Sequence, residues 1–194
     1  MPIPNHYAAT LSDLDLQMVR AVPSGGNWKD IPTSIPSKRL EQIRTSCAAG
    51  LGSRSTYYGR LKFDDPSYTI STYFNRPGNG CHIHPDFDGG QHRTISHREA
   101  ARLQSFPDSF SFIGGIGSVN KQIGNAVPPL LAYQLATSFG SPGSFVDLFC
   151  GAGGLSLGFT WAGWNPVVGA DIDANFVKTY RDNIHDHAIQ TDLA

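Results

Sequence analysis

Apolar residues, glycines and polar residues follow one another in a regular order in the last third of the chain. Five strand-like residues, Phe145 to Phe149, run into a loop that carries Gly151, Gly153 and Gly154. A helical pattern rich in Leu and Phe follows, and a second apolar run spans residues 166–170. A strand, a glycine loop, a helix and a second strand form the βαβ unit of nucleotide-binding folds, in which glycines let a ligand approach the backbone.

The residue that ends the second apolar run is acidic. Asp171 lies twenty residues after Gly151, and an acidic side chain at the end of the second strand is placed to bind the hydroxyls of a ribose. Dehydrogenases and methyltransferases both use this pattern. The third glycine of the dinucleotide fingerprint would fall at Ser156, which disfavours a pyrophosphate ligand, and the sequence contains no P-loop.

Outside this unit the pattern predicts short elements separated by Pro and Gly. Ser12 is expected to cap a helix, and Ser96 with Glu99 forms a capping box for a helix from His97 to about Ser105. Aromatic and β-branched residues predict further strands, and apolar spacing predicts two more helices. The expected strands are 57–63 and 68–74, with another beginning at Cys81, and the expected helices begin at Pro128–Pro129 and span about 174–183.

Three longer stretches resemble motifs of the DNA cytosine-C5 methyltransferases. Asp147-Leu-Phe-Cys-Gly-Ala-Gly-Gly-Leu-Ser156 resembles the family's first motif, which binds S-adenosylmethionine, and residues 98–107 and 122–129 look like the ninth and tenth motifs. The resemblance implies an α/β fold, a Rossmann-like methyltransferase half-domain with an incomplete parallel sheet, joined to a small β-rich DNA-recognition region. It assigns residues 1–118 to that recognition domain, ninth motif included, and residues 119–194 to the cofactor-binding part of the catalytic domain.

The motifs stand in an unusual order. In the family the glycine-loop motif usually comes near the N-terminus and the ninth and tenth motifs close the chain, whereas here the order is ninth, tenth, first. This order looks like a circular permutation, which is physically easy when the original ends lie close together. Residues 138–144, rich in Ser, Gly and Pro, are expected to be the linker that joins them.

The resemblance also implies roles for individual residues. Phe149 would pack on the adenine and Ile172 would cover its face, in place of the tryptophan that the family often has there. The glycines Gly151, Gly153 and Gly154 would line the methionine moiety. The remaining implied contacts are Asp171 to the ribose hydroxyls, Asp192 to the adenine amino group, Asn125, Ala126 and Val127 to the methionine end, and Thr69 to a DNA phosphate near the flipped base.

The residues that perform the family's chemistry are not found in the sequence. The family adds a cysteine thiolate to C6 of a flipped cytosine, which makes C5 nucleophilic, while a glutamate assists at N3. That cysteine sits in a Pro-Cys dipeptide and that glutamate in Glu-Asn-Val, and neither sequence occurs here. We therefore expect no catalytic residue in this chain, no methylation by it alone, and an exposed hydrophobic sheet edge. Duplex DNA and a complementary chain or C-terminal segment that carries the catalytic cysteine are the implied partners.

Two other classes of function stay open. A non-catalytic DNA-binding or regulatory partner of a methyltransferase would keep the fold without the chemistry. A dehydrogenase-type nucleotide binder would leave residues 98–107 unexplained. Restriction–modification is the expected setting for the enzyme, and the genomic sequence downstream, with or without a Pro-Cys and a Glu-Asn-Val, would distinguish the first alternative.

Charge and cysteine content change this picture little. The 194 residues carry a formal net charge of −1, but 13 of the 15 Lys and Arg lie in residues 1–140. A locally basic stretch is expected either to neutralise DNA phosphates or to be a solvated face; it comprises Lys38, Arg39, Arg44, Arg54, Arg60 and Lys62.

The three cysteines are too scattered for a disulfide framework, and Cys81, His82 and His84 lack the spacing of a zinc site, so no metal is expected. No apolar run reaches the roughly 20 residues of a membrane span, and no signal-peptide pattern begins the chain, so a cytoplasmic protein is expected.

Overall fold

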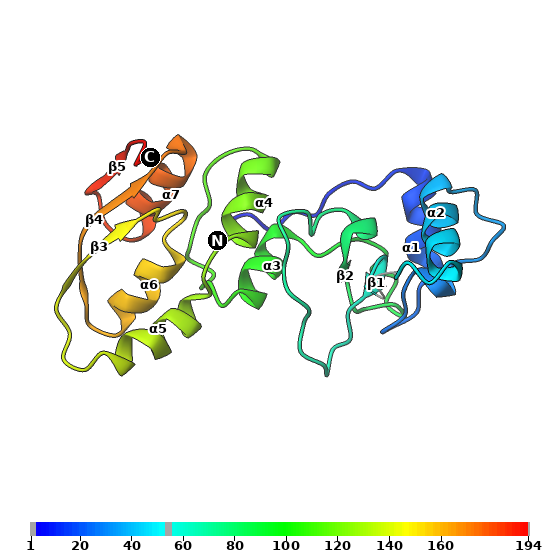
Figure 1. Cartoon of the computed structure of the whole chain (residues 1–194), viewed down its shortest axis with the longest axis horizontal. Helices are drawn as coiled ribbons and strands as arrows, with labels where there is room; N and C mark the ends of the chain where they lie inside the picture. Colours follow the sequence, from blue (N-terminus) through cyan, green and yellow to red (C-terminus); the bar gives the residue numbers. More distant parts are fainter. Residues whose placement is uncertain (1–2, 53–55, 194) are drawn as a thin grey trace. The chain divides into compact units, whose positions relative to one another are not determined.

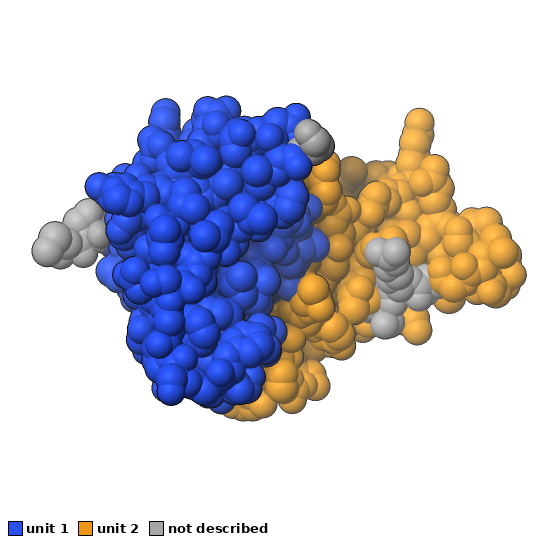
Figure 2. All heavy atoms as spheres, turned by 60° about the vertical axis from the view of Figure 1, so that its left-hand side comes forward, with its two compact units in different colours: residues 1–7, 70–72, 97–194 blue, residues 8–69, 73–96 orange. Residues whose placement is uncertain are grey.

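The computed structural model describes residues 3–52 and 56–193, which form two compact units (Figure 2). Of the described residues, unit 1 comprises 3–7, 70–72 and 97–193, and unit 2 comprises 8–52, 56–69 and 73–96. No helix among the described residues is long and apolar enough to cross a membrane. The ninth-motif-like stretch falls in the same unit as the glycine loop, while the functional boundary after residue 118 stays a prediction.

The core of unit 1 is a three-stranded parallel sheet with the order β3-β4-β5. Its strands are β3 (Ser144–Leu148), β4 (Asn165–Asp171) and β5 (Ala188–Gln190), connected by the helices α6 (Gly154–Trp161) and α7 (Ala174–Asn183). Both helices lie on the same side of the sheet (Figure 1), as two successive right-handed crossovers between neighbouring parallel strands require. The predicted βαβ unit and the predicted helix over 174–183 are confirmed.

The other face of this sheet is apolar and exposed. Asp147 and Ala188 point toward the helices and are buried, whereas Val146, Leu148 and Ile189 alternate with them and are 53%, 57% and 49% exposed. A parallel sheet normally has both faces covered, because its strands carry apolar side chains in both directions. The described part of unit 1 covers one face only.

Helix α5 (Pro129–Ser138) packs closely against α6, because two glycines on α6 leave room for it. A Cβ built on Gly158 would lie 2.3 Å from the carbonyl oxygen of Pro129, and one built on Gly154 would lie 2.4 Å from that of Val127. Neither distance is possible for a real side chain. The tenth-motif-like stretch therefore rests directly on the helix that follows the glycine loop, and only residues 139–143 separate α5 from β3.

Helix α3 (His97–Leu103) begins where the capping box predicts and ends close to the predicted position. Arg98 on this helix is fully buried and donates hydrogen bonds to the carbonyl oxygens of Pro4, Pro107 and Phe110. Arg102 forms a two-point ion pair with Asp108, with distances of 2.8 and 2.7 Å. Both arginines thus hold the local chain in place. The helix α4 (Ile116–Gly124) follows.

Unit 2 contains more helix than strand. It consists of α1 (Asp13–Ala21), the 3-10 helix η1 (Trp28–Asp30), α2 (Lys38–Ala48), β1 (Gly59–Arg60), the 3-10 helix η2 (Pro77–Asn79) and β2 (Cys81–Ile83), with β1 and β2 parallel. As predicted, Ser12 caps α1 by accepting a hydrogen bond from the N–H of Asp15 at 3.1 Å. The apolar core of unit 2 is formed by Met18, Val19, Val22, Trp28, Ile31, Leu40, Ile43, Tyr58 and Ile83.

Two strand predictions are wrong. The segment 57–63 contains only the two-residue β1, and the segment 68–74 contains no strand. Tyr68 and Tyr73 are 58% and 52% exposed, so their β propensity is not matched by a buried face. Residues 70–72 pack instead on α4, where a Cβ on Gly124 would lie 2.6 Å from the backbone nitrogen of Thr72. Packing between segments far apart in the sequence has overridden the local pattern.

Candidate functional site

The glycine loop begins at the carboxyl end of β3 with a series of left-handed backbone conformations. Phe149, Gly151 and Gly153 have φ values of 63°, 54° and 96°. Phe149 adopts this conformation despite its side chain, which is 74% exposed. Packing favours glycine at position 153, since a Cβ there would lie 2.8 Å from Cγ1 of Ile184 and 3.0 Å from the ring of Tyr180. The loop is thus shaped by packing from α7 as well as by the needs of a ligand.

Asp171, at the end of β4, holds this loop. Its Oδ2 accepts a hydrogen bond from the backbone N–H of Gly151 at 2.9 Å, and its Oδ1 accepts one from the N–H of Asp173 at 2.9 Å. Asp173 in turn caps α7, accepting from the N–H groups of Asn175 and Phe176. The carboxylate therefore joins the ends of two neighbouring strands. Each oxygen has a second lone pair with which it can accept a further hydrogen bond.

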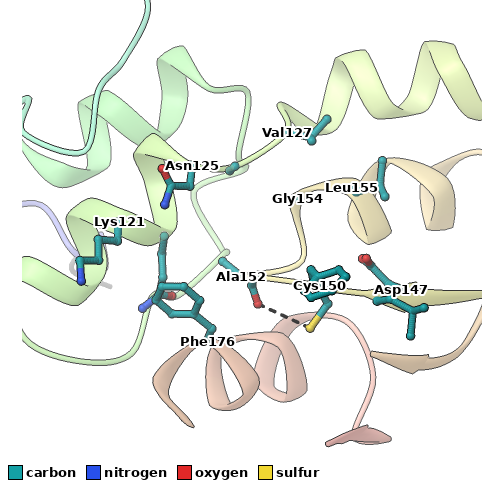
Figure 3. A pocket seen from close by; sticks show the side chains of 14 residues that line it. Lys121, Asn125, Val127, Asp147, Cys150, Ala152, Gly154, Leu155 and Phe176 are labelled. Carbon is teal, nitrogen blue, oxygen red and sulfur yellow. Dashed lines mark hydrogen bonds between the residues drawn. The ribbon is translucent and has the colours of Figure 1, made fainter. Parts of the chain in front are cut away.

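A cavity of about 160 Å³ lies between the glycine loop and the segment 121–127 (Figure 3). Parallel α/β sheets bind their ligands at this position, beyond the carboxyl ends of the strands. The cavity is lined by Lys121, Gln122, Asn125, Ala126, Val127, Asp147, Leu148, Phe149, Cys150, Gly151, Ala152, Gly154, Leu155 and Phe176. Six of the ten residues predicted to bind cofactor are among them: Phe149, Gly151, Gly154, Asn125, Ala126 and Val127.

The other four predicted cofactor residues lie outside the cavity wall. Gly153 is buried under α7, and Asp171 reaches the loop through Gly151. Ile172 is 64% exposed, and Asp192 is exposed just after β5. Asp171 nevertheless ends β4, and Ile172 and Asp192 lie just after the carboxyl ends of β4 and β5, at the edge of the sheet where the glycine loop also begins. Their contacts with a cofactor stay predictions.

Several cavity residues were not predicted from the sequence. Lys121 comes from α4, a helix that the sequence pattern did not indicate. Phe176 comes from the first turn of α7, where the N-cap at Asp173 could have revealed it. Asp147 lines the cavity and is only 4% exposed; burial is the main cause that raises the pKa of its carboxyl group, opposed by a hydrogen bond from Ser156.

Neither buried thiol of the chain has the environment of a nucleophile. Burial, together with the carboxylates of Asp147 and Asp171, raises the pKa of Cys150 to about 12. Burial raises the pKa of Cys81 to about 11. A nucleophilic cysteine needs the opposite shift, because the thiolate is the reactive form. Cys47, the third cysteine, is partly buried against the apolar core of unit 2.

The residues considered for metal and DNA binding lie mainly in unit 2. Cys81 and His82, which were considered as metal ligands, are buried in β2. Among the described residues, the group whose ligand atoms lie close enough together to hold a metal ion is a different one, His185, Asp186 and His187. Thr69 is exposed. In the basic stretch, Arg60 is 1% exposed and donates to the carbonyl oxygens of Val19, Val22, His84 and Gln91, so it is a structural residue and is not available to phosphates. Arg54 lies outside the described residues.

Comparison with known proteins identifies the family. Residues 24–141 and 143–194 match the family described as C-5 cytosine-specific DNA methylase. The chain is 36% identical over 137 residues to the type II methyltransferase M.Sau96I of Staphylococcus aureus, covering 70% of this chain and 30% of that protein. It is 37% identical over 139 residues to the type II methylase M.HgiDII of Herpetosiphon aurantiacus, covering 69% and 36%.

Eukaryotic relatives match over a similar length. Identity to the DNA (cytosine-5)-methyltransferase 1B of Oryza sativa subsp. japonica is 35% over 141 residues, which covers 68% of this chain and 9% of that protein. The chain spans about a third of the bacterial relatives given above and a tenth of the plant one. Since the family match extends over nearly the whole chain, this protein belongs to the C-5 cytosine-specific DNA methylase family.

Proposed function

We propose that unit 1 binds S-adenosylmethionine and that the chain is part of a DNA (cytosine-5-)-methyltransferase. The observation that carries the proposal is the cavity beside the glycine loop, whose wall combines that loop with residues 125–127. The two stretches lie far apart in the sequence, and both resemble cofactor-binding motifs of the family to which the chain belongs. S-adenosylmethionine would supply the methyl group.

The positions of several predicted cofactor residues support this proposal. The exposed ring of Phe149 is available to pack on an adenine, with Ile172 near the end of the neighbouring strand. Asp171 can accept from ribose hydroxyls while it holds Gly151. Asn125, Ala126 and Val127 line the cavity and would contact the methionine end. We propose Asp192 for the adenine amino group and Thr69 for a DNA phosphate.

Methyl transfer requires a further segment that carries the nucleophile. Residues 1–194 contain no Pro-Cys and no Glu-Asn-Val, and the raised pKa values of Cys81 and Cys150 argue against either as a replacement. We propose that a segment with these motifs, continuous with this chain or on a second chain, completes the enzyme. Its substrates would be S-adenosylmethionine and cytosine in duplex DNA, in a restriction–modification system.

The exposed sheet face supports the need for such a segment. Val146, Leu148 and Ile189 form an apolar surface on the side of the sheet opposite α6 and α7. A complementary segment that continues the sheet from the free edge of β3 and covers this face would bury these side chains. Full burial of an aliphatic side chain contributes about 1.5–3 kcal/mol, and these three are about half exposed, so covering each would contribute roughly half of that amount.

We propose that a circular permutation produced the motif order. The family match divides at residue 142, inside the predicted linker, and α5 packs directly on α6. Ends of a parent chain at α5 and β3 would therefore already lie in one packed layer. A linker of the length of residues 139–143 could join them without moving the core.

The test is incorporation of tritiated methyl groups into duplex DNA. We expect none from residues 1–194 alone, and robust incorporation when a complementary segment with Pro-Cys and Glu-Asn-Val is co-expressed. The matched control is the same segment with its nucleophilic cysteine replaced by serine. If DNA binding is strong but incorporation stays absent with every complementary segment, the chain is a non-catalytic DNA-binding partner. Incorporation by residues 1–194 alone would show that the missing-nucleophile argument is wrong.

A further inference from the structure

A chain of hydrogen bonds runs beneath the glycine loop and connects three elements. The hydroxyl group of Tyr180, on α7, donates to Oγ of Ser156 at 3.0 Å. The hydroxyl group of Ser156, on α6, donates to Oδ2 of Asp147 at 2.5 Å. Asp147 lies on β3 and lines the cavity. This series of hydrogen bonds therefore begins behind the loop and ends at a carboxylate in the wall of the proposed cofactor site.

The three side chains that form these hydrogen bonds are buried, and the backbone next to them leaves room for the ring of Tyr180. Ser156 and Tyr180 are both 0% exposed, and Asp147 is 4% exposed. The ring of Tyr180 fits between two glycines: a Cβ on Gly153 would lie 3.0 Å from the ring, and one on Gly169 would lie 2.8 Å from it. Ser156 stands where the dinucleotide fingerprint has its third glycine, so its hydroxyl group is a departure from that pattern.

Burial raises the pKa of the Asp147 carboxyl group, and the hydrogen bond from Ser156 opposes that rise, so the serine helps to keep the carboxylate charged. In water-free surroundings a carboxylate is costly unless hydrogen-bond donors face it, and the Ser156 hydroxyl group provides one at short distance. Tyr180 orients that hydroxyl group, because a serine that accepts from a tyrosine has its own proton free to donate. Lys121, which also lines the cavity, is the one lysine or arginine among the lining residues. A negative charge in this wall will attract a positively charged ligand atom.

We propose that Ser156 and Tyr180 are positioning residues that hold Asp147 as a charged acceptor in the cavity wall, and that Asp147 thereby favours the sulfonium of S-adenosylmethionine over the neutral thioether of the demethylated product. The two ligands differ in one methyl group and one positive charge. A carboxylate that is merely structural would affect both ligands equally. The inference rests on the proposed function, because it concerns selectivity within the same cavity.

The test is calorimetric measurement of the dissociation constants for S-adenosylmethionine and S-adenosylhomocysteine, with the ratio of the two as the readout. Asp147→Asn keeps an acceptor for Ser156 and removes the charge, and we expect it to weaken the sulfonium ligand by about fivefold relative to the thioether. Ser156→Ala and Tyr180→Phe should shift the ratio in the same direction by smaller factors. Tyr133→Phe removes a hydroxyl group outside the chain of hydrogen bonds and should leave the ratio unchanged.

The outcomes separate this inference from the proposed function. If the wild-type protein binds neither ligand, alone or with a complementary segment, the proposed function fails and the inference fails with it. If the wild type binds both ligands and the three variants weaken both by the same factor, the cofactor site stands but Asp147 only braces the loop, and the inference is overturned. Should Asp147→Asn not fold, the ratio in Ser156→Ala and Tyr180→Phe decides in the same way.

Discussion

The carboxylate of Asp171 and the backbone N–H of Gly151 are joined by a hydrogen bond of 2.9 Å. The two residues lie at the ends of neighbouring strands, twenty positions apart in the sequence. An acidic residue at this position was expected to bind ribose, and the structure gives it a second task, which is to fix the first glycine of the loop. The proposed ribose contact and the loop geometry would thus depend on one side chain.

This link makes Asp171→Ala a sensitive variant. We expect it to weaken cofactor binding by about 1–3 kcal/mol, because it leaves ribose hydroxyls and the Gly151 N–H without their acceptor. The measurement is a calorimetric titration with S-adenosylhomocysteine. Asp171→Asn, which keeps one acceptor oxygen, should lie between the wild type and Asp171→Ala. An affinity equal to that of the wild type in a folded Asp171→Ala protein would place the ribose contact elsewhere.

The two glycines of the loop with positive φ should respond differently to substitution. Gly151 has open space around its Cα, so Gly151→Ala should cost about 1 kcal/mol of unfolding free energy through backbone strain alone. Gly153→Ala adds a clash with Ile184 and Tyr180 and should cost about 1–3 kcal/mol more. Urea denaturation of the whole chain, followed by a probe in unit 1, measures the loss of unfolding free energy in each variant. Equal losses for the two variants would contradict the close packing of α7 on the loop.

Unit 2 should become less stable as the pH falls, because of His82. Burial lowers the pKa of this histidine from 6.5 to about 4. Between pH 6.5 and about pH 4, the unfolded chain therefore binds more protons at His82 than the folded chain does. The stability contributed by neutral His82 is complete above pH 6.5 and is lost as the pH falls toward 4. The loss is about 3 kcal/mol at most.

Hydrogen exchange measures this loss locally. The amide of Leu61, which donates to the carbonyl of Ile83, reports on unit 2, and the amide of Cys150, which donates to Ala170, is the internal control in unit 1. In His82→Gln the decrease in protection of Leu61 between pH 7 and pH 4 should be smaller than in the wild type, while the control amide should behave alike in both proteins. Identical pH profiles of Leu61 in the two proteins would refute the assignment to His82.

The exposed sheet face can be tested by placing charges on it. Val146→Lys and Ile189→Lys alter side chains that are half exposed, so they should change the stability of the isolated chain by no more than about 0.5 kcal/mol. They should strongly reduce assembly with a complementary segment, measured by co-purification. Leu51→Lys, at a position in unit 2 that is 79% exposed, is the matched control. Normal assembly of both sheet variants would show that this face is not the interface.

The sequence predicted best those parts of the fold that depend on local signals. The strand at 145, the glycine loop, Asp171 and the helix over 174–183 form a continuous unit in which each element is next to its partner in the chain. The segment 68–74 was predicted wrongly, because aromatic and β-branched residues signal a strand only where a partner strand and a buried face exist. Arg60 was assigned to a basic patch, and no local pattern indicates that four backbone carbonyls enclose it.

In the candidate site, too, the residues in continuous sequence motifs were predicted and those brought in by packing were not. Motif resemblance predicted six residues of the cavity wall, since both stretches that supply them are continuous in the sequence. Lys121, Phe176 and Asp147 were not predicted as site residues, because they reach the cavity from α4, α7 and the inner face of β3. The connection from Tyr180 through Ser156 to Asp147 depends on packing between three elements, which no spacing rule describes.

The most direct test of the account is a pair of calorimetric titrations of the wild-type protein, alone and with a complementary segment, with S-adenosylhomocysteine and with NAD. The account predicts saturable binding of S-adenosylhomocysteine at one site per chain, lost or strongly weakened in Asp171→Ala, and much weaker binding of NAD. Preferential binding of NAD, or binding of S-adenosylhomocysteine that is indifferent to Asp171, would contradict it.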